Sequence, residues 1–331
     1  MADRPGPPRE VAEAIRRACR PLIVGHVRPD ADCLGAMCAL AISLRHDGRC
    51  EPRLYYRADQ VSGRLAFLAA LAQYPVAPPE QCRSCDAVIV LDTAQSSRAA
   101  ADPPLPDLAA AGLPVINIDH HVDNPGFGAV NWVVPTAGST SELVYELLAS
   151  MRIPILPEVA SLLYAGIHAD TAGFSLPNTT AETLRTAAAL VAAGANVGDL
   201  CERLCRSQSR GEFDLARIIY DNTRLTPDGL IAYSTASHEE ITGAGCGPAD
   251  IDEQVAIPRS LKGIRMAILF TEGKPGRVRI NFRGEGGTNV LELARELGGG
   301  GHAASAGAIV NGSLRQVVPD VLERAARRLR S

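Results

Sequence analysis

The first half of the chain alternates short apolar runs with longer segments of helical periodicity. The runs at Pro21–Val24, Ala87–Leu91 and 114–118 predict buried strands, because roughly four to eight consecutive apolar residues are typical of strands covered on both faces. A weaker run at 52–56 predicts a further strand. Apolar spacing predicts helices at 11–20, 33–45, 138–151 and 158–168. Strands that alternate with helices favour an α/β domain with a doubly wound parallel sheet.

The pattern changes in the last third of the chain. Residues 181–225 are alanine-rich with helical spacing, and Pro227-Asp228-Gly229 is a turn signal. The segments after it predict strands at 230–235, 265–271 and 277–283 and helices at 289–297 and 313–330. With 331 residues, the chain is too long for one small core. We expect a larger first domain, a helical connector and a smaller α/β domain, at residues 1–190, 191–227 and 228–331.

Charged side chains follow the predicted strands where each strand ends. They are His26, Asp30, Asp32, Asp92, Asp119, His120 and His121, and Asp170 follows the helix at 158–168. In a doubly wound sheet the carboxyl ends of the strands meet at one edge, so we expect these groups to converge. Without cations, the repulsion among so many buried carboxylates would raise their pKa values strongly. The pattern therefore predicts a metal centre.

The mixture of donors restricts the metal. Carboxylates combined with imidazoles suit manganese, iron, cobalt or zinc better than calcium. If the loop after the first strand is extended, Asp30 and Asp32 share one face and Ala31 points away, so the two carboxylates can serve adjacent ions. Asp92 is placed to bridge them. Two ions about 3.5–4 Å apart lower the pKa of a shared water and stabilise an in-line phosphoryl displacement.

Composition excludes several classes of protein. No apolar run approaches the roughly 20 residues of a membrane span, and the N-terminus lacks the apolar stretch of a secretory signal. The nine scattered cysteines favour a cytoplasmic, reducing location. Cys82/Cys85 and Cys201/Cys205 allow a four-cysteine zinc site or a redox pair, but we favour unrelated thiols.

Charge and aromatic content bear on the substrate. The net charge is −4, yet residues 251–331 carry 13 Lys+Arg against 8 Asp+Glu. An acidic front and a basic rear are typical of a metal-binding half and a phosphate-binding half. Aromatic residues make up only 4% of the chain, which does not indicate a long stacking platform for single strands.

Taken together, the motifs resemble those of a known family, the DHH phosphoesterases. The matching stretches are His26-Val-Arg-Pro-Asp30-Ala-Asp32, Asp92, Asp119-His120-His121-Val-Asp-Asn124, Asp170 in Gly-Ile-His-Ala-Asp-Thr, and the glycine-rich 298–307, which resembles the DHH-associated domain. The resemblance covers nearly the whole chain. Its domain order is similar to that of bacterial oligoribonucleases (nanoRNases) that also act on 3′-phosphoadenosine-5′-phosphate.

The resemblance implies roles for single residues. Two divalent cations, with Mn²⁺ the expected metal, would be held by one set of His26, Asp30 and Asp92 and a second set of Asp32, Asp92, His120 and Asp170. His121 would be catalytic and face the scissile phosphate, with Asp119 as the partner that orients its neighbours. Substrate binding would involve Asn124, Arg283, Gly299, Gly300, Gly301 and His302.

Physical reasoning supports part of this substrate set. Consecutive glycines let backbone N–H groups curve around a phosphate oxygen in what we expect to be a flexible loop, although a plain turn is the alternative. Arg283 and His302 would add charge-assisted hydrogen bonds. The family flanks the residue matching Arg283 with serines, whereas Asn281, Phe282 and Gly284 stand here.

The sequence predicts a two-metal phosphodiesterase that cleaves short oligoribonucleotides to mononucleotides and also accepts 3′-phosphoadenosine-5′-phosphate. Its expected partners are nucleotide substrates, with neither a membrane nor a stable long nucleic acid. A cyclic or linear dinucleotide phosphodiesterase is the main alternative. A manganese pyrophosphatase conflicts with the glycine loop, and a sensor that binds without cleaving conflicts with the full ligand set. The preference for RNA or DNA, the direction of cleavage, the native metal and the oligomeric state, a homodimer included, stay open.

Overall fold

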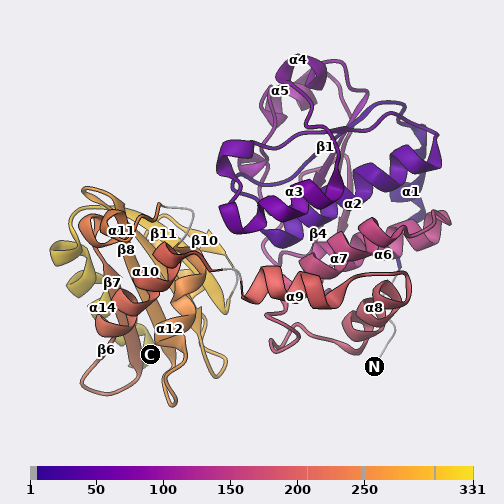
Figure 1. Ribbon diagram of the computed structural model, residues 1–331. Coiled ribbons are helices and arrows are strands. Elements are labelled where there is room, and N and C mark those ends of the chain that lie inside the picture. The colour runs from indigo at the N-terminus through magenta and orange to yellow at the C-terminus, as the bar shows by residue number, and fades with distance from the viewer. Residues whose placement is uncertain (1–5, 207, 248–250, 302, 331) are drawn as a thin grey trace. The chain divides into compact units, whose positions relative to one another are not determined.

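The computed structural model describes residues 6–206, 208–247, 251–301 and 303–330. The chain forms two compact units, which we call unit 1 (Met1–Ser207) and unit 2 (Gln208–Ser331) (Figure 1). Part of the segment predicted as a connector, the helix α10 (Arg210–Asp221), belongs to unit 2. The domain boundaries at 190 and 227 stay a prediction.

Unit 1 is built on a five-stranded sheet in the order β2-β1-β3-β4-β5, and every neighbouring pair is parallel. The strands are β1 (Pro21–Val24), β2 (Arg53–Leu54), β3 (Ala87–Leu91), β4 (Val115–Asp119) and β5 (Val130–Val133). Every residue of β1, β3 and β4 is buried, in keeping with sequences that are apolar apart from Asn117 and Asp119 of β4. This confirms the predicted parallel α/β sheet, although β5 was not predicted.

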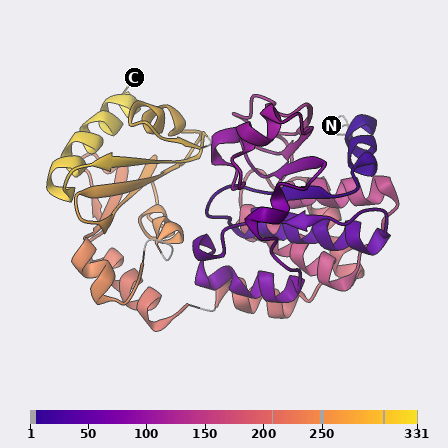
Figure 2. The same cartoon turned by 90° about the horizontal axis from the view of Figure 1, so that it is seen from above.

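Helices cover both faces of this sheet (Figures 1 and 2). On one face, Ile23, Ile89 and Ile116 join a large core with α2, α6 and α7. On the other face, Leu22 and Val88 join a smaller core with α4 and α5. The helices of unit 1 are α1 (Arg9–Arg17), α2 (Ala31–Asp47), α3 (Ala66–Ala72), α4 (Pro79–Cys82), α5 (Leu105–Ala110), α6 (Thr140–Met151), α7 (Pro157–Asp170), α8 (Ala181–Ala192) and α9 (Val197–Cys205). Successive residues of each strand point to opposite faces, so both faces are apolar. Because helices cover both of these faces, the sheet is doubly wound.

Unit 2 contains a six-stranded mixed sheet in the order β10-β11-β9-β8-β7-β6. Its strands are β6 (Arg224–Leu225), β7 (Ile231–Ala236), β8 (Met266–Lys274), β9 (Arg277–Gly284), β10 (Gly300–Gly301) and β11 (Ser305–Asn311), and its helices besides α10 are α11 (His238–Gly243), α12 (Ala256–Arg259), α13 (Leu291–Glu296) and α14 (Leu314–Arg330). Only β7 and β8 pair in parallel. One face packs against α13 and α14, and the other contributes Leu269 to a cluster with α10, α11 and α12.

Within the described parts of both units, no helix is both long enough and apolar enough to span a bilayer.

Candidate metal centre

Side chains from three neighbouring strands meet at the carboxyl edge of the sheet in unit 1. His26 follows β1, Asp92 follows β3, and β4 ends on Asp119 with His120 and His121 directly after it. Asp92 lies at the middle of the group. Its carboxylate oxygens lie 3.5 Å from Nε2 of His26, 3.6 Å from Nε2 of His120 and 3.7 Å from Nδ1 of His121. The sheet therefore brings together the groups that the sequence placed at separate strand ends.

The backbone of Asp92 is held in an unusual conformation. Its φ of 51° lies in the left-handed region, which costs most residues about 1–2 kcal/mol but which Asp tolerates better. The side chain is buried, and Oδ1 accepts a hydrogen bond from Oγ1 of Thr140 at 2.9 Å. Backbone strain of this kind clusters at functional sites, because it aims a side chain that regular structure would direct elsewhere.

Asp30 and Asp32 do not lie on an extended loop, so the predicted alternation about Ala31 is wrong. The helix α2 begins at Ala31, two residues earlier than expected, and Asp30 caps it by accepting a hydrogen bond from the Cys33 N–H at 3.0 Å. An aspartate with this N-cap geometry starts a helix that apolar spacing alone does not reveal. The other oxygen of Asp30, Oδ2, lies 3.6 Å from Nε2 of His26.

Asp32, in the first turn of α2, faces the N-terminus of α6. Its two carboxylate oxygens accept hydrogen bonds from the N–H groups of Thr140 and Ser141, at 2.6 and 2.9 Å. Burial and the negative charges of Asp92 and Asp170 nevertheless raise the pKa of Asp32 well above its usual range. This repulsion is the kind that a bound cation relieves.

Asp170 is the last residue of α7, and its Oδ2 lies 3.0 Å from Nε2 of His120. Burial raises the pKa of Asp170 despite the attraction of His120. The amide of Asn178 donates to the backbone carbonyls of Asp170 and Gly138, so it ties the end of α7 to the loop before α6. A helix end thus completes a site that strand ends begin.

The Asp119-His120-His121 loop is organised by its first residue. Oδ1 of Asp119 lies 2.7 Å from Nδ1 of His121, and Oδ2 accepts a hydrogen bond from the Asn124 amide at 2.6 Å. Burial lowers the pKa of His121, but the bond with Asp119 and the negative charges of Asp92 and Asp119 together outweigh burial and raise that pKa overall. The same amide of Asn124 also donates to Oδ1 of Asn117 and to the Thr93 carbonyl. The side-chain amide of Asn124 is therefore hydrogen-bonded to other residues of the protein. Its contact with substrate stays a prediction.

The donor sets fit a divalent metal. Three groups each bring their ligand atoms within 4.8 Å of one another: His26, Cys33 and Asp92; Asp92, His120 and His121; and Asp32, His120 and Asp170. Carboxylates and imidazoles are the donors that transition metals take in hydrolytic sites. Cys33 was missed by the sequence reasoning. The sequence could have indicated Cys33, because it lies three residues after Asp30, which places it in the first turn of α2 beside the predicted ligands.

Known proteins share this organisation. Residues 20–167 match the DHH family, N-terminal domain, and residues 231–331 match the DHHA1 domain. A Thermus thermophilus protein named bifunctional oligoribonuclease and PAP phosphatase NrnA is 32% identical over 321 residues, which cover 95% of this chain and 92% of that protein. The chain belongs to the DHH family. This confirms the resemblance predicted from the motifs.

A second relative and a solved structure are also similar over most of the chain. A Bacillus subtilis protein of the same name is 30% identical over 288 residues, covering 86% of this chain and 87% of that protein. The crystal structure of an exopolyphosphatase-related protein from Bacteroides fragilis superposes with a TM-score of 0.86 at 24% identity, over 97% of this chain and 96% of that one. The fold is therefore shared over both units. DHH phosphoesterases depend on metals, in keeping with the clusters at the sheet edge.

Unit 2 brings together residues predicted to bind phosphate. Arg283 on β9 pairs with Ser305 on β11, and the next residue of β11, Ala306, pairs with Gly301. Gly300 and Gly301 form β10 rather than the flexible loop that we expected. The sequence did not predict this strand, because a run of glycines has no side-chain pattern from which strand pairing can be predicted. His302 lies outside the described residues.

The glycines of this segment differ in the space around them. A Cβ on Gly299 would collide with the Gly307 carbonyl, and a Cβ on Gly301 would collide with the Ser305 carbonyl. A Cβ on Gly300 would meet no atom within 4 Å. Gly299 and Gly301 therefore allow close packing on β11, whereas Gly300 is the position at which the backbone can be approached.

The sequence left open a four-cysteine zinc site or a redox pair among Cys82, Cys85, Cys201 and Cys205. Cys82 and Cys85 are buried in the smaller apolar core of unit 1, and the other two lie on α9. None of the four belongs to a metal-ligand group among the described residues, and each is a free cysteine.

Proposed function

We propose that the protein is a two-metal phosphodiesterase that hydrolyses short oligoribonucleotides to mononucleotides and also accepts 3′-phosphoadenosine-5′-phosphate. The observation that carries the proposal is the convergence of the ligand groups around Asp92 at the edge of the sheet. The similarity to two proteins named as bifunctional oligoribonucleases and PAP phosphatases supports the choice of substrate.

The two proposed ligand sets share Asp92. His26, Asp30 and Asp92 would hold one ion, and Asp32, Asp92, His120 and Asp170 would hold the second, with Mn²⁺ as the metal. The hydrogen bonds from α6 to Asp32 and the left-handed backbone of Asp92 support preformed ligands. When bound, paired divalent cations supply charge neutralisation at the phosphate and lower the pKa of water.

His121 is the proposed catalytic side chain. Its Nδ1 lies against Asp119, so the imidazole is fixed in one orientation, and Asn124 in turn holds Asp119. His121 contacts the scissile phosphate and protonates the leaving oxygen. The pKa of His121 is raised against the effect of burial by its bond with Asp119 and by the charges of Asp92 and Asp119. This direction supports the role, because an acid must carry its proton near neutral pH.

Unit 2 supplies the proposed phosphate grip. Backbone N–H groups of Gly300 and Gly301, with Arg283 and His302, bind the terminal phosphate of the substrate. The N–H of Gly299 donates to the Ala294 carbonyl at 2.7 Å, so Gly299 would contribute through its close packing on β11 rather than as a donor to phosphate. The pairing of β9, β10 and β11 supports this grouping, because β11 lies between β9, which carries Arg283, and β10, which carries Gly300 and Gly301. A cytoplasmic location is part of the proposal, and the nine free cysteines support it.

A substrate panel tests the proposal. Metal-free protein is supplied with Mn²⁺ and offered a 5′-phosphorylated triribonucleotide, its deoxy counterpart, 3′-phosphoadenosine-5′-phosphate, a cyclic dinucleotide and pyrophosphate. We expect mononucleotides from the triribonucleotide and adenosine 5′-phosphate from the bisphosphate. Release of phosphate from pyrophosphate alone, or opening of the cyclic dinucleotide alone, would replace the proposal with one of those activities.

A further inference from the structure

We propose that Cys33 is a sulfur ligand of the metal ion held by His26 and Asp92. The inference rests on the proposed metal centre and adds to it a donor of a different chemical kind. Ligation exchanges the S–H bond for a sulfur–metal bond, and the thiol proton passes to solvent.

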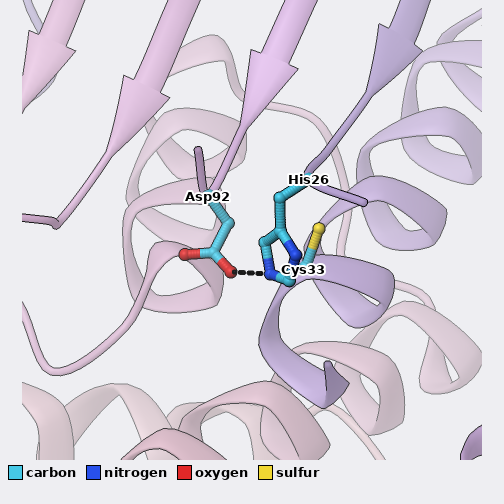
Figure 3. Close-up of side chains that lie close together, drawn as sticks. All are labelled: His26, Cys33 and Asp92. Atoms are coloured by element: carbon cyan, nitrogen blue, oxygen red, sulfur yellow. Dashed lines mark ion pairs between the residues drawn. The ribbon is translucent and has the colours of Figure 1, made fainter. Parts of the chain in front are cut away.

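The geometry brings three donors from three elements to one place. Figure 3 shows Cys33 rising from the first turn of α2 and Asp92 approaching from the end of β3, with the imidazole of His26 after β1 beside both. One ring nitrogen of His26, one oxygen of Asp92 and Sγ of Cys33 lie within 4.8 Å of one another. Donors on one tetrahedral ion lie about 3.3–3.8 Å apart, so only small adjustments separate this group from coordination.

The backbone around the sulfur leaves room for it. A Cβ on Gly25 would collide with Sγ of Cys33 and would come within 2.9 Å of Sδ of Met37. Any larger residue at the end of β1 would therefore displace the sulfur from the ligand group. The absence of a side chain at Gly25 therefore allows Sγ of Cys33 to occupy its place in the ligand group.

A purely apolar role explains Cys33 less well. Buried free cysteines usually behave as small hydrophobic residues, and Cys38, further along α2, is such a case. Both side chains have no exposed surface. Among the described residues, Cys33 belongs to a metal-ligand group and Cys38 does not. Cys38 is therefore a matched control on the same helix.

A thiolate ligand changes the choice of metal at this position. Sulfur is a soft donor that favours Zn²⁺ and Co²⁺, whereas carboxylate and water favour Mn²⁺. We expect Cys33→Ser to weaken the affinity for Co²⁺ and Zn²⁺ by about tenfold or more and that for Mn²⁺ by less than about threefold.

Cobalt spectroscopy tests the inference apart from activity. Co²⁺ is titrated into metal-free wild type, Cys33→Ser, Cys33→Ala and Cys38→Ala, each checked for folding by circular dichroism. Visible bands report cobalt in any site of nitrogen and oxygen donors, and a near-ultraviolet charge-transfer band reports a sulfur ligand. We expect both bands in the wild type and in Cys38→Ala, and visible bands alone in both Cys33 variants.

The failures are distinguishable. Visible bands without charge transfer in the wild type, or charge transfer that survives in Cys33→Ser, would overturn the sulfur ligand and leave the metal centre in place. A wild-type spectrum without charge transfer overturns the sulfur ligand even if both Cys33 variants fail to fold. An absence of every cobalt band would instead remove the metal centre, and with it the proposed function.

Discussion

Asp92 combines three features that seldom occur in one residue. It is buried, its backbone is left-handed, and its carboxylate lies within 3.7 Å of histidines that follow two neighbouring strands. Burial and backbone strain each cost free energy in the absence of a cation. These features fit the proposed role of Asp92 as a ligand shared by two ions.

Asp92→Asn separates charge from shape. Asparagine tolerates the left-handed backbone and keeps an oxygen for the hydroxyl of Thr140, so we expect the fold to persist. The loss of the shared charge should lower kcat/KM by at least about 100-fold and weaken Mn²⁺ binding. Steady-state kinetics and isothermal titration check both effects. Nearly unchanged Mn²⁺ affinity in a folded Asp92→Asn protein would show that Asp92 is not a shared ligand.

At the scale of elements, the metal centre and the helices stabilise each other. Asp32 accepts the first two N–H groups of α6, whose N-terminal dipole favours a negative charge there. The chain thus uses one carboxylate both as a candidate ligand and as a helix cap. Among the described residues, the side chain of Asp170 accepts no such hydrogen bond from a backbone N–H group. Its carboxylate instead forms an ion pair with His120.

This difference predicts unequal effects on stability. In the metal-free protein, Asp32→Ala leaves two buried N–H groups without their acceptor and should cost about 1–3 kcal/mol of unfolding free energy. Asp170→Ala leaves no backbone N–H group of the described residues without a recorded acceptor, so it should cost less. Urea unfolding followed by fluorescence of Trp132, the single tryptophan, which lies on β5 in unit 1, measures both values. Equal losses in the two variants would contradict the capping role.

The elements that the sequence predicted share one physical property. The strands β1, β3 and β4 are buried on both faces, so their sequences are apolar apart from Asn117 and Asp119 of β4. The charged groups after these strands were expected to converge because parallel strands end at one edge. The strand β5 was missed because Val130–Val133 is short and mostly half-buried. The start of α2 and the role of Cys33 depend on a capping bond and on packing against Gly25, which apolar spacing does not encode.

For the whole molecule, the proposed function assigns a different role to each unit. Unit 1 contains the candidate metal ligands, and unit 2 contains the glycine segment and Arg283. The matches to two separate domain families, at residues 20–167 and 231–331, follow the same division. Substitutions in unit 2 should therefore affect substrate binding without changing metal binding.

Gly300 and Gly301 provide a paired test of this division. Gly301→Ala should disturb the packing of β10 on β11 and raise KM for the triribonucleotide by about tenfold or more, because it displaces the phosphate grip beside Arg283. Gly300→Ala meets open space, so any rise in KM there should come without loss of stability. Both variants should bind Mn²⁺ as the wild type does. A loss of Mn²⁺ affinity in either would argue against separate roles for the units.

The most direct test of the account is anomalous diffraction from a crystal of the protein grown with Mn²⁺. We predict two peaks on either side of Asp92, one among His26, Asp30 and Asp92 and the other among Asp32, Asp92, His120 and Asp170. A well-ordered sheet edge with no anomalous peak beside Asp92 would contradict the account.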